Sequence, residues 1–223
     1  MAARDYGQYG GVTRALELVG ERWAMLIVRD LLVGPRRYGE LAGGLARIPS
    51  NILSARLKEL QAAGVIRRAP HSRVIVYELT PYGRELEPVV LALGAWGFKA
   101  LGDPREEQIV TPDSMTMDLR SAFRADVAVS LPRTAYAARF GPAELLIRVD
   151  GSTLDVARGD VTRGDVVSGD RPVDLAFASG AGIHRLISGE LTPRRAIETG
   201  VVEVLRGRGD LLDRFASTFH LAA

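Results

Sequence analysis

The chain of 223 residues contains no cysteine and only three histidines. Without cysteine, the sequence excludes disulfide bonds, thiolate metal sites and thiol-based redox sensing. The scattered histidines do not form a zinc-ligand pattern. We therefore expect neither a metal nor a cofactor.

Long apolar runs are also missing. A helix needs about 20 consecutive, mostly apolar residues to cross a bilayer, and no stretch approaches that length. The opening segment "MAARDYGQYGG" lacks the apolar core of a secretory signal. We expect a soluble, cytoplasmic protein with no membrane partner.

Charge is almost balanced over the whole chain but unevenly divided along it. The formal net charge is +2, yet residues 1–100 carry 14 Lys and Arg against 9 Asp and Glu, whereas the remainder carries 15 against 18. A basic first half joined to a mildly acidic second half predicts that only the first half meets a polyanion such as nucleic acid.

Apolar residues of the first half recur at the three- and four-residue spacing of helices. Gly20 is expected to divide the stretch from Val12 to Leu31 into two helices, and Gly34-Pro35 to end the second. Another apolar stripe runs from Tyr38 to Leu45. A further helix is expected from about Asn51 to Ala63, with Ser50 as its N-cap and Gly64 after its end.

β-Branched residues follow this helix. "VIRR" and "VIVYELT" flank the polar segment "APHS", which predicts a two-stranded ribbon with its turn at that segment. A long apolar stripe from Leu86 to Leu101 then requires a partner, with Pro88 kinking the helix or resetting its start.

The helix at 51–61 has two unlike faces. Leu53, Leu57 and Leu60 fall on one side, and the small polar side chains of Asn51 and Ser54, with Ala55 and Lys58, fall on the other. That polar face suits the floor of a major groove. Predicted phosphate and ribbon contacts are Arg36, Arg37, Arg56, Arg67, Arg68, His71 and Arg73. Solvated helices commonly carry such faces, and helix-turn-helix shapes also occur in proteins that never touch DNA.

The second half is predicted to be an α+β module. Strands are expected around Gly141-Pro142 and the hairpin dipeptide Asp150-Gly151, and helices and strands alternate to the end. We predict domains at 1–101 and 113–223, joined by a linker at 102–112. His184 and His220 lack a nearby nucleophile pattern, so no enzyme is predicted.

Motifs of the first half resemble those of the HxlR-type winged-helix transcription regulators. The resemblance covers about residues 9–100 and is strongest in "GPRRYGEL", "LSARLKELQAAGVI" and "LTPYGREL". It implies a homodimer that places two recognition helices in successive major grooves of a near-palindromic operator. By position, Ser50, Asn51, Ser54, Arg56 and Lys58 become base readers or clamps, and the arginines of 67–73 become wing contacts. Many members carry a cysteine near the N-terminus, which this chain lacks.

The segment "LISGELTPRRAIETGVVEVLRG" looks like part of a sterol-carrier-protein type 2 domain, a resemblance that covers about residues 113–220. It implies a small sheet with helices on one face, enclosing a tunnel for a hydrophobic molecule. Candidate ligand contacts are Phe177, Ile183, Leu186, Ile187, Leu191, Phe215 and Phe219. The same residues suit a solid core equally well.

Together these patterns predict a ligand-responsive transcription regulator, more often a repressor in this family, that binds a double-stranded operator as a homodimer. A hydrophobic or aromatic effector would bind the second domain. One alternative is a lipid or metabolite carrier whose first domain serves dimerisation. Another is an enzyme that uses the second domain's cavity, although a catalytic set of residues is missing.

Overall fold

The computed structural model describes residues 5–102, 104–105, 107–159, 161, 167–168, 171–180 and 182–221. The chain divides into two compact units, Met1–Val90 and Leu91–Ala223. Both contain helices and strands, which confirms the predicted α+β class. The predicted domain limits at 101 and 113 stay a prediction, and residues 103 and 106 of the predicted linker lie outside the described residues.

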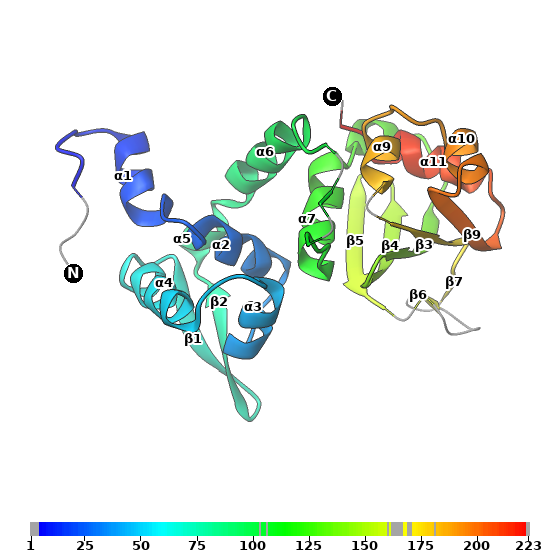
Figure 1. The fold of residues 1–223 in the computed structure, drawn as a ribbon. Helices are drawn as coiled ribbons and strands as arrows, with labels where there is room; N and C mark the ends of the chain where they lie inside the picture. The colour runs from blue at the N-terminus through cyan, green and yellow to red at the C-terminus, as the bar shows by residue number, and fades with distance from the viewer. Residues whose placement is uncertain are drawn as a thin grey trace. The chain divides into compact units, whose positions relative to one another are not determined.

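The first unit is a small helical domain with a two-stranded ribbon (Figure 1). Its elements are α1 (Gly11–Val19), α2 (Ala24–Val33), α3 (Tyr38–Gly44), α4 (Ser50–Ala62), β1 (Ile66–His71), β2 (Val74–Leu79) and α5 (Pro81–Arg84). Helix α6 (Glu87–Phe98) begins in this unit and ends in the second.

Glycines and prolines separate these helices much as predicted. Gly20 caps α1, and α2 ends at Val33, directly before Gly34-Pro35. Gly64 follows α4 with a left-handed backbone (φ 71°), a conformation that glycine adopts without steric cost. The N-cap prediction was wrong: Pro49 occupies the cap position in an extended conformation, and Ser50 is already the first helical residue.

The ribbon is longer than predicted. Strand β1 runs through Ala69 and Pro70, so the turn lies at Ser72 and Arg73 rather than in "APHS". Pro70 pairs with Ile75 in a ribbon of only two strands, where a missing N–H is tolerated at an edge. Ser72 takes the left-handed conformation (φ 56°) that lets the chain reverse.

The junction after β2 is unusually tight. Thr80 caps α5 by accepting a hydrogen bond from the Gly83 amide (3.0 Å), and its hydroxyl donates to the Gly64 carbonyl (2.6 Å). Pro81 occupies the first turn, where its missing N–H costs nothing. A Cβ on Gly83 would lie 2.0 Å from the carbonyl oxygen of Val65. Only glycine fits at position 83.

Helix α6 starts at Glu87, so Pro88 resets the start of the helix and does not kink it. Although the helix is rich in apolar residues, none of its side chains is buried. Val89, Leu93 and Trp96 are 47%, 51% and 75% exposed.

The second unit contains a mixed sheet with helices against one face (Figure 1). Its elements are α7 (Pro112–Ala122), α8 (Ala125–Ala128), β3 (Thr134–Phe140), β4 (Ala143–Asp150), β5 (Thr153–Arg158), β6 (Val167–Ser168), β7 (Arg171–Pro172), β8 (Leu175–Ser179), α9 (Ile183–Ile187), α10 (Pro193–Glu198), β9 (Val202–Gly207) and α11 (Leu211–Thr218).

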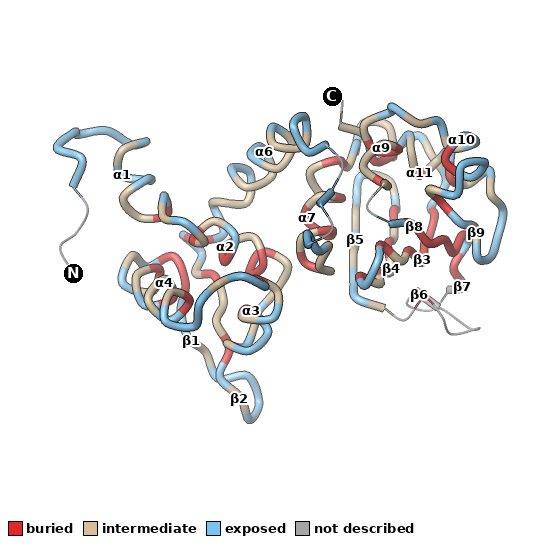
Figure 2. The backbone as a smooth tube through the Cα atoms, viewed as in Figure 1, coloured by how far each residue is buried: buried red, intermediate tan, exposed pale blue. Residues whose placement is uncertain are grey.

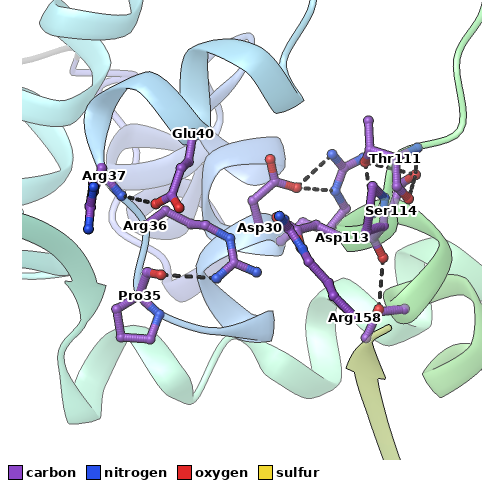
Figure 3. A network of polar contacts seen from close by, with 12 residues as sticks. Asp30, Pro35, Arg36, Arg37, Glu40, Thr111, Asp113, Ser114 and Arg158 are labelled. Atoms are coloured by element: carbon purple, nitrogen blue, oxygen red, sulfur yellow. Dashed lines mark hydrogen bonds and ion pairs between the residues drawn. The ribbon is translucent and has the colours of Figure 1, made fainter. Parts of the chain in front are cut away.

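The main sheet has the strand order β5-β4-β3-β8-β9, in which only β3 and β8 are parallel. One face carries Tyr136, Phe140 and Phe177, and these pack with side chains of α7, α9 and α11 in the main core. A smaller cluster on other strand positions joins Ala137 and Ala176 to Val161. A capping box of Thr111 and Ser114 starts α7, and Arg158 of β5 donates to Asp113 (2.8 Å) within the same unit (Figure 3).

Within the described residues, no helix combines the length and the apolar character needed to cross a bilayer.

Candidate nucleic-acid interface

Helix α4 presents a packed face and a polar face, as the sequence predicts. Leu53, Leu57 and Leu60 are at most 1% exposed and fix the helix against the rest of the unit. Asn51, Ser54 and Lys58 on the opposite side are exposed, and Figure 2 shows buried and less buried stretches of backbone alternating along α4. The helix therefore offers short polar side chains and one cation to a surface that approaches it.

The start of α3 brings two arginines close to the ribbon. The backbone of Arg36 exchanges hydrogen bonds with Tyr77 of β2, donating at 3.0 Å and accepting at 2.7 Å, and its guanidinium donates to the Pro35 carbonyl. The backbone amide of Arg37 donates to the Glu40 carboxylate (2.6 Å; Figure 3), and the Arg37 side chain is exposed. The first turn of α3 is thereby held at the base of the ribbon.

The basic side chains of the ribbon differ in whether a carboxylate already pairs with them. Arg67 is paired with Glu78 across the strands (2.7 Å), and Arg68 lies over the ring of Tyr77, 6.0 Å from its centroid. His71, the last residue of β1, and Arg73, in the turn, are both exposed. Arg68 and Arg73 are thus better placed for an external phosphate than Arg67 is, because a carboxylate already partners Arg67.

Arg56 does not lie on the exposed surface. Its guanidinium side chain is 11% exposed and forms ion pairs with Glu21 (3.2 Å) and with Glu59 one helical turn later. An arginine held between two carboxylates is neutralised locally, so the predicted phosphate contact at Arg56 is not favoured. Spacing along the helix could not show this, because Glu21 belongs to the segment before α2.

Two residues of this surface were missed from the sequence. Tyr38 was assigned only to an apolar stripe, yet its hydroxyl contacts Ser50 and Ser54 of α4. Arg47 is exposed in the turn immediately before α4. Its place next to a predicted groove-facing helix was the available signal for that arginine.

The predicted ligand contacts of the second unit form part of a packed core. Phe177, Phe215 and Phe219 are fully buried. The ring centroid of Phe215 lies 5.1 Å from that of Phe177 and 4.7 Å from that of Phe219. Ile183, Leu186 and Ile187 are at most 4% exposed, and Leu191 is partly exposed. These contacts agree with a core that its own side chains fill, which is one of the two arrangements that the sequence left open.

Buried Tyr136 borders this aromatic cluster. Its ring meets Phe215 edge to face, with centroids 5.4 Å apart, and burial raises the pKa of its phenol well above the ordinary value. Nearby, Arg214 donates to the Thr134 hydroxyl (2.6 Å). Tyr136 therefore stays neutral and acts as a core residue.

Known proteins match the first half of the chain. Residues 18–104 match the family model described as HxlR-like helix-turn-helix. The uncharacterised HTH-type transcriptional regulator YdeP of Bacillus subtilis is 34% identical over 91 residues, which cover 40% of this chain and 71% of that protein. The chain belongs to the HxlR-like family.

Other proteins are similar to a comparable length of the chain. YvaP of Bacillus subtilis, also an uncharacterised HTH-type transcriptional regulator, is 37% identical over 86 residues, which cover 37% of this chain and 80% of that protein. Rv3095 of Mycobacterium tuberculosis, of the same description, is 45% identical over 96 residues, but the match spans only 60% of its length and 42% of this chain. A crystal structure of the regulator ytcD is 35% identical, with a TM-score of 0.39 and coverage of 42% of this chain and 98% of that one.

Proposed function

We propose that this HxlR-like protein is a sequence-specific, double-stranded DNA-binding regulator of transcription, with α4 as its recognition helix. The observation that carries the proposal is the pairing of a leucine face that fixes α4 with an opposite face of Asn51, Ser54 and Lys58. Short polar side chains on a rigid helix can reach base edges in a major groove.

The cations around α4 support the same proposal. Arg37 lies at the start of α3, and Arg68 and Arg73 lie on the ribbon, so positive side chains flank the helix on two elements. Phosphate contacts of this kind fix the register of a protein on DNA, whereas contacts with base edges provide its sequence preference. The ribbon would act as the wing.

The proposal includes a homodimer, with α6 in its interface. Helix α6 has a largely apolar surface with no buried side chain, and Leu93 and Trp96 are at least half exposed. Exposed apolar surface of this kind is typical of protein contacts. A dimer would present two copies of α4 to two half-sites.

Finer parts of the proposal are a repressor role in the cytoplasm and a hydrophobic effector of the second unit. Because the core around Phe177 and Phe215 is packed, an effector that enters it must displace side chains. Coupling to DNA requires that the effector bind one DNA-binding state more tightly than the other.

Fluorescence anisotropy with DNA from immediately upstream of the gene tests the central proposal. The full-length protein is expected to prefer this duplex to a scrambled one across a salt series. Asn51→Ala combined with Lys58→Ala should remove most of that preference without lowering the melting temperature, because both side chains are exposed.

The matched control is Arg194→Ala, which changes an exposed side chain of α10 in the second unit. It should leave DNA binding intact. Unchanged sequence preference in the Asn51 and Lys58 double variant would show that α4 does not read the bases.

A further inference from the structure

A hydrogen-bonded tyrosine connects α3 to the outer face of α4. The hydroxyl of Tyr38, the first residue of α3, lies 3.0 Å from the carbonyl oxygen of Ser50 and 3.3 Å from the hydroxyl oxygen of Ser54. These contacts join residues 12 and 16 positions apart, and Ser54 itself is exposed.

Counting protons decides the direction of both bonds. A tyrosine hydroxyl has a single hydrogen, and a carbonyl oxygen only accepts. Tyr38 therefore donates its hydrogen to the Ser50 carbonyl, and the second contact requires Ser54 to donate its own hydrogen to the Tyr38 oxygen. The Ser54 hydroxyl then has no hydrogen left for an external partner, and both lone pairs of its oxygen can still accept one.

We propose that Tyr38 is a specificity-determining residue that makes Ser54 a pure hydrogen-bond acceptor toward DNA. The inference rests on the proposed function, because it assigns a base preference to the same recognition helix. A free serine hydroxyl rotates to serve either donors or acceptors and so discriminates weakly. A Ser54 hydroxyl that donates to Tyr38 can only accept a hydrogen bond from DNA.

The preferred partner follows from the edges of the bases in the major groove. Adenine presents its N6 amino group there and cytosine its N4 amino group, whereas guanine and thymine present acceptor oxygens. An acceptor-only Ser54 therefore selects adenine or cytosine on the strand that it contacts. Guanine or thymine at that position places two acceptors against each other.

Selection of binding sites from a randomised duplex pool tests this inference on the full-length protein. The unmodified protein should select adenine or cytosine over guanine or thymine at one position of each half-site, by about fivefold for a single hydrogen bond. Tyr38→Phe frees the Ser54 hydroxyl and should reduce that preference to less than about twofold, while preferences elsewhere in the site persist. Ser54→Ala should lose the preference at the same position.

Tyr82→Phe is the matched control, since Tyr82 is 53% exposed on α5 and its loss should change no preference. Retention of the adenine or cytosine preference by Tyr38→Phe would overturn the inference, as would a preference for guanine or thymine at the position that Ser54→Ala affects. If Tyr38→Phe does not fold, Ser54→Ala alone decides: a site unchanged at every position overturns the inference. In those cases the regulator proposal stands, whereas failure of the unmodified protein to select any sequence rejects both.

Discussion

At the scale of single residues, neighbours distant in sequence decide which cations can meet DNA. Arg56 and Lys58 lie two positions apart on α4, yet Arg56 is held by Glu21 and Glu59 while Lys58 is exposed. A sequence pattern predicts which side of a helix a residue occupies. It does not show that a carboxylate from another segment already neutralises the side chain.

Replacing Arg56 should therefore change the stability of the protein, whereas replacing Lys58 should change its DNA binding. Arg56→Met should lower the free energy of unfolding by about 1 to 2 kcal/mol, because it leaves two partly buried carboxylates without their partner. It should leave the salt dependence of DNA binding unchanged. Lys58→Met is the matched control and should reduce the salt slope by about one per protomer while stability stays the same. Denaturant titration and anisotropy measure the two quantities, and the reverse pattern would return Arg56 to the DNA surface.

At the scale of elements, local sequence patterns predicted which helices and strands form, and in which order, better than they predicted where each turn lies and which side chains meet. The periodic apolar residues, with helix-ending glycines at positions 20, 34 and 64, predicted the bounds of α1, α2 and α4 closely. The ribbon turn was misplaced because Pro70 suggests a turn from sequence but is tolerated at the edge of two strands. Tyr38 was missed because its hydroxyl bonds depend on how α3 packs against α4.

In the second unit, the sequence could not distinguish a tunnel from a filled core. Apolar positions such as Phe177 and Phe215 have the same spacing in both cases, and only the observed ring contacts show how closely they pack. The resemblance to sterol-carrier-protein type 2 domains stays a prediction.

Helix α6 provides the prediction at this scale. Leu93→Glu combined with Trp96→Glu places charges on its exposed apolar surface and should weaken dimer formation at least tenfold, because a charge buried in an interface without a partner is strongly unfavourable. Sedimentation velocity over a concentration series measures the change. Leu205→Glu on β9, where Leu205 is 41% exposed, is the control. Equal association of both variants would remove α6 from the interface.

At the scale of the whole molecule, the uneven charge has a measurable consequence. Arg37, Lys58, Arg68 and Arg73 are exposed in the first unit, whereas Arg194 and Arg208 of the second unit are paired with Glu198 and Asp210. The Arg208 hydrogen bond lowers the pKa of Asp210, which keeps that pair ionised. The second unit should therefore add little to phosphate binding.

A dimer with these four exposed cations per protomer should lose DNA affinity with a log–log salt slope of about 7. Arg73→Gln should reduce the slope by about 2 per dimer, because one phosphate contact is lost from each protomer. Arg208→Gln should leave it unchanged. Anisotropy titrations at several salt concentrations measure the slopes, and an equal decrease in both variants would mean that DNA also contacts the second unit.

The tight junction at Thr80, Pro81 and Gly83 bears on how relatives of this protein are recognised. Each of the three residues suits the backbone at its position: Thr80 caps the helix, Pro81 fits the first helical turn, and Gly83 makes a contact that leaves no room for a side chain. None of these requirements involves the bases that α4 would read. Chains that share "LTPYGREL" can therefore have the same fold and bind different operators. Similarity in this motif says little about which genes a regulator controls.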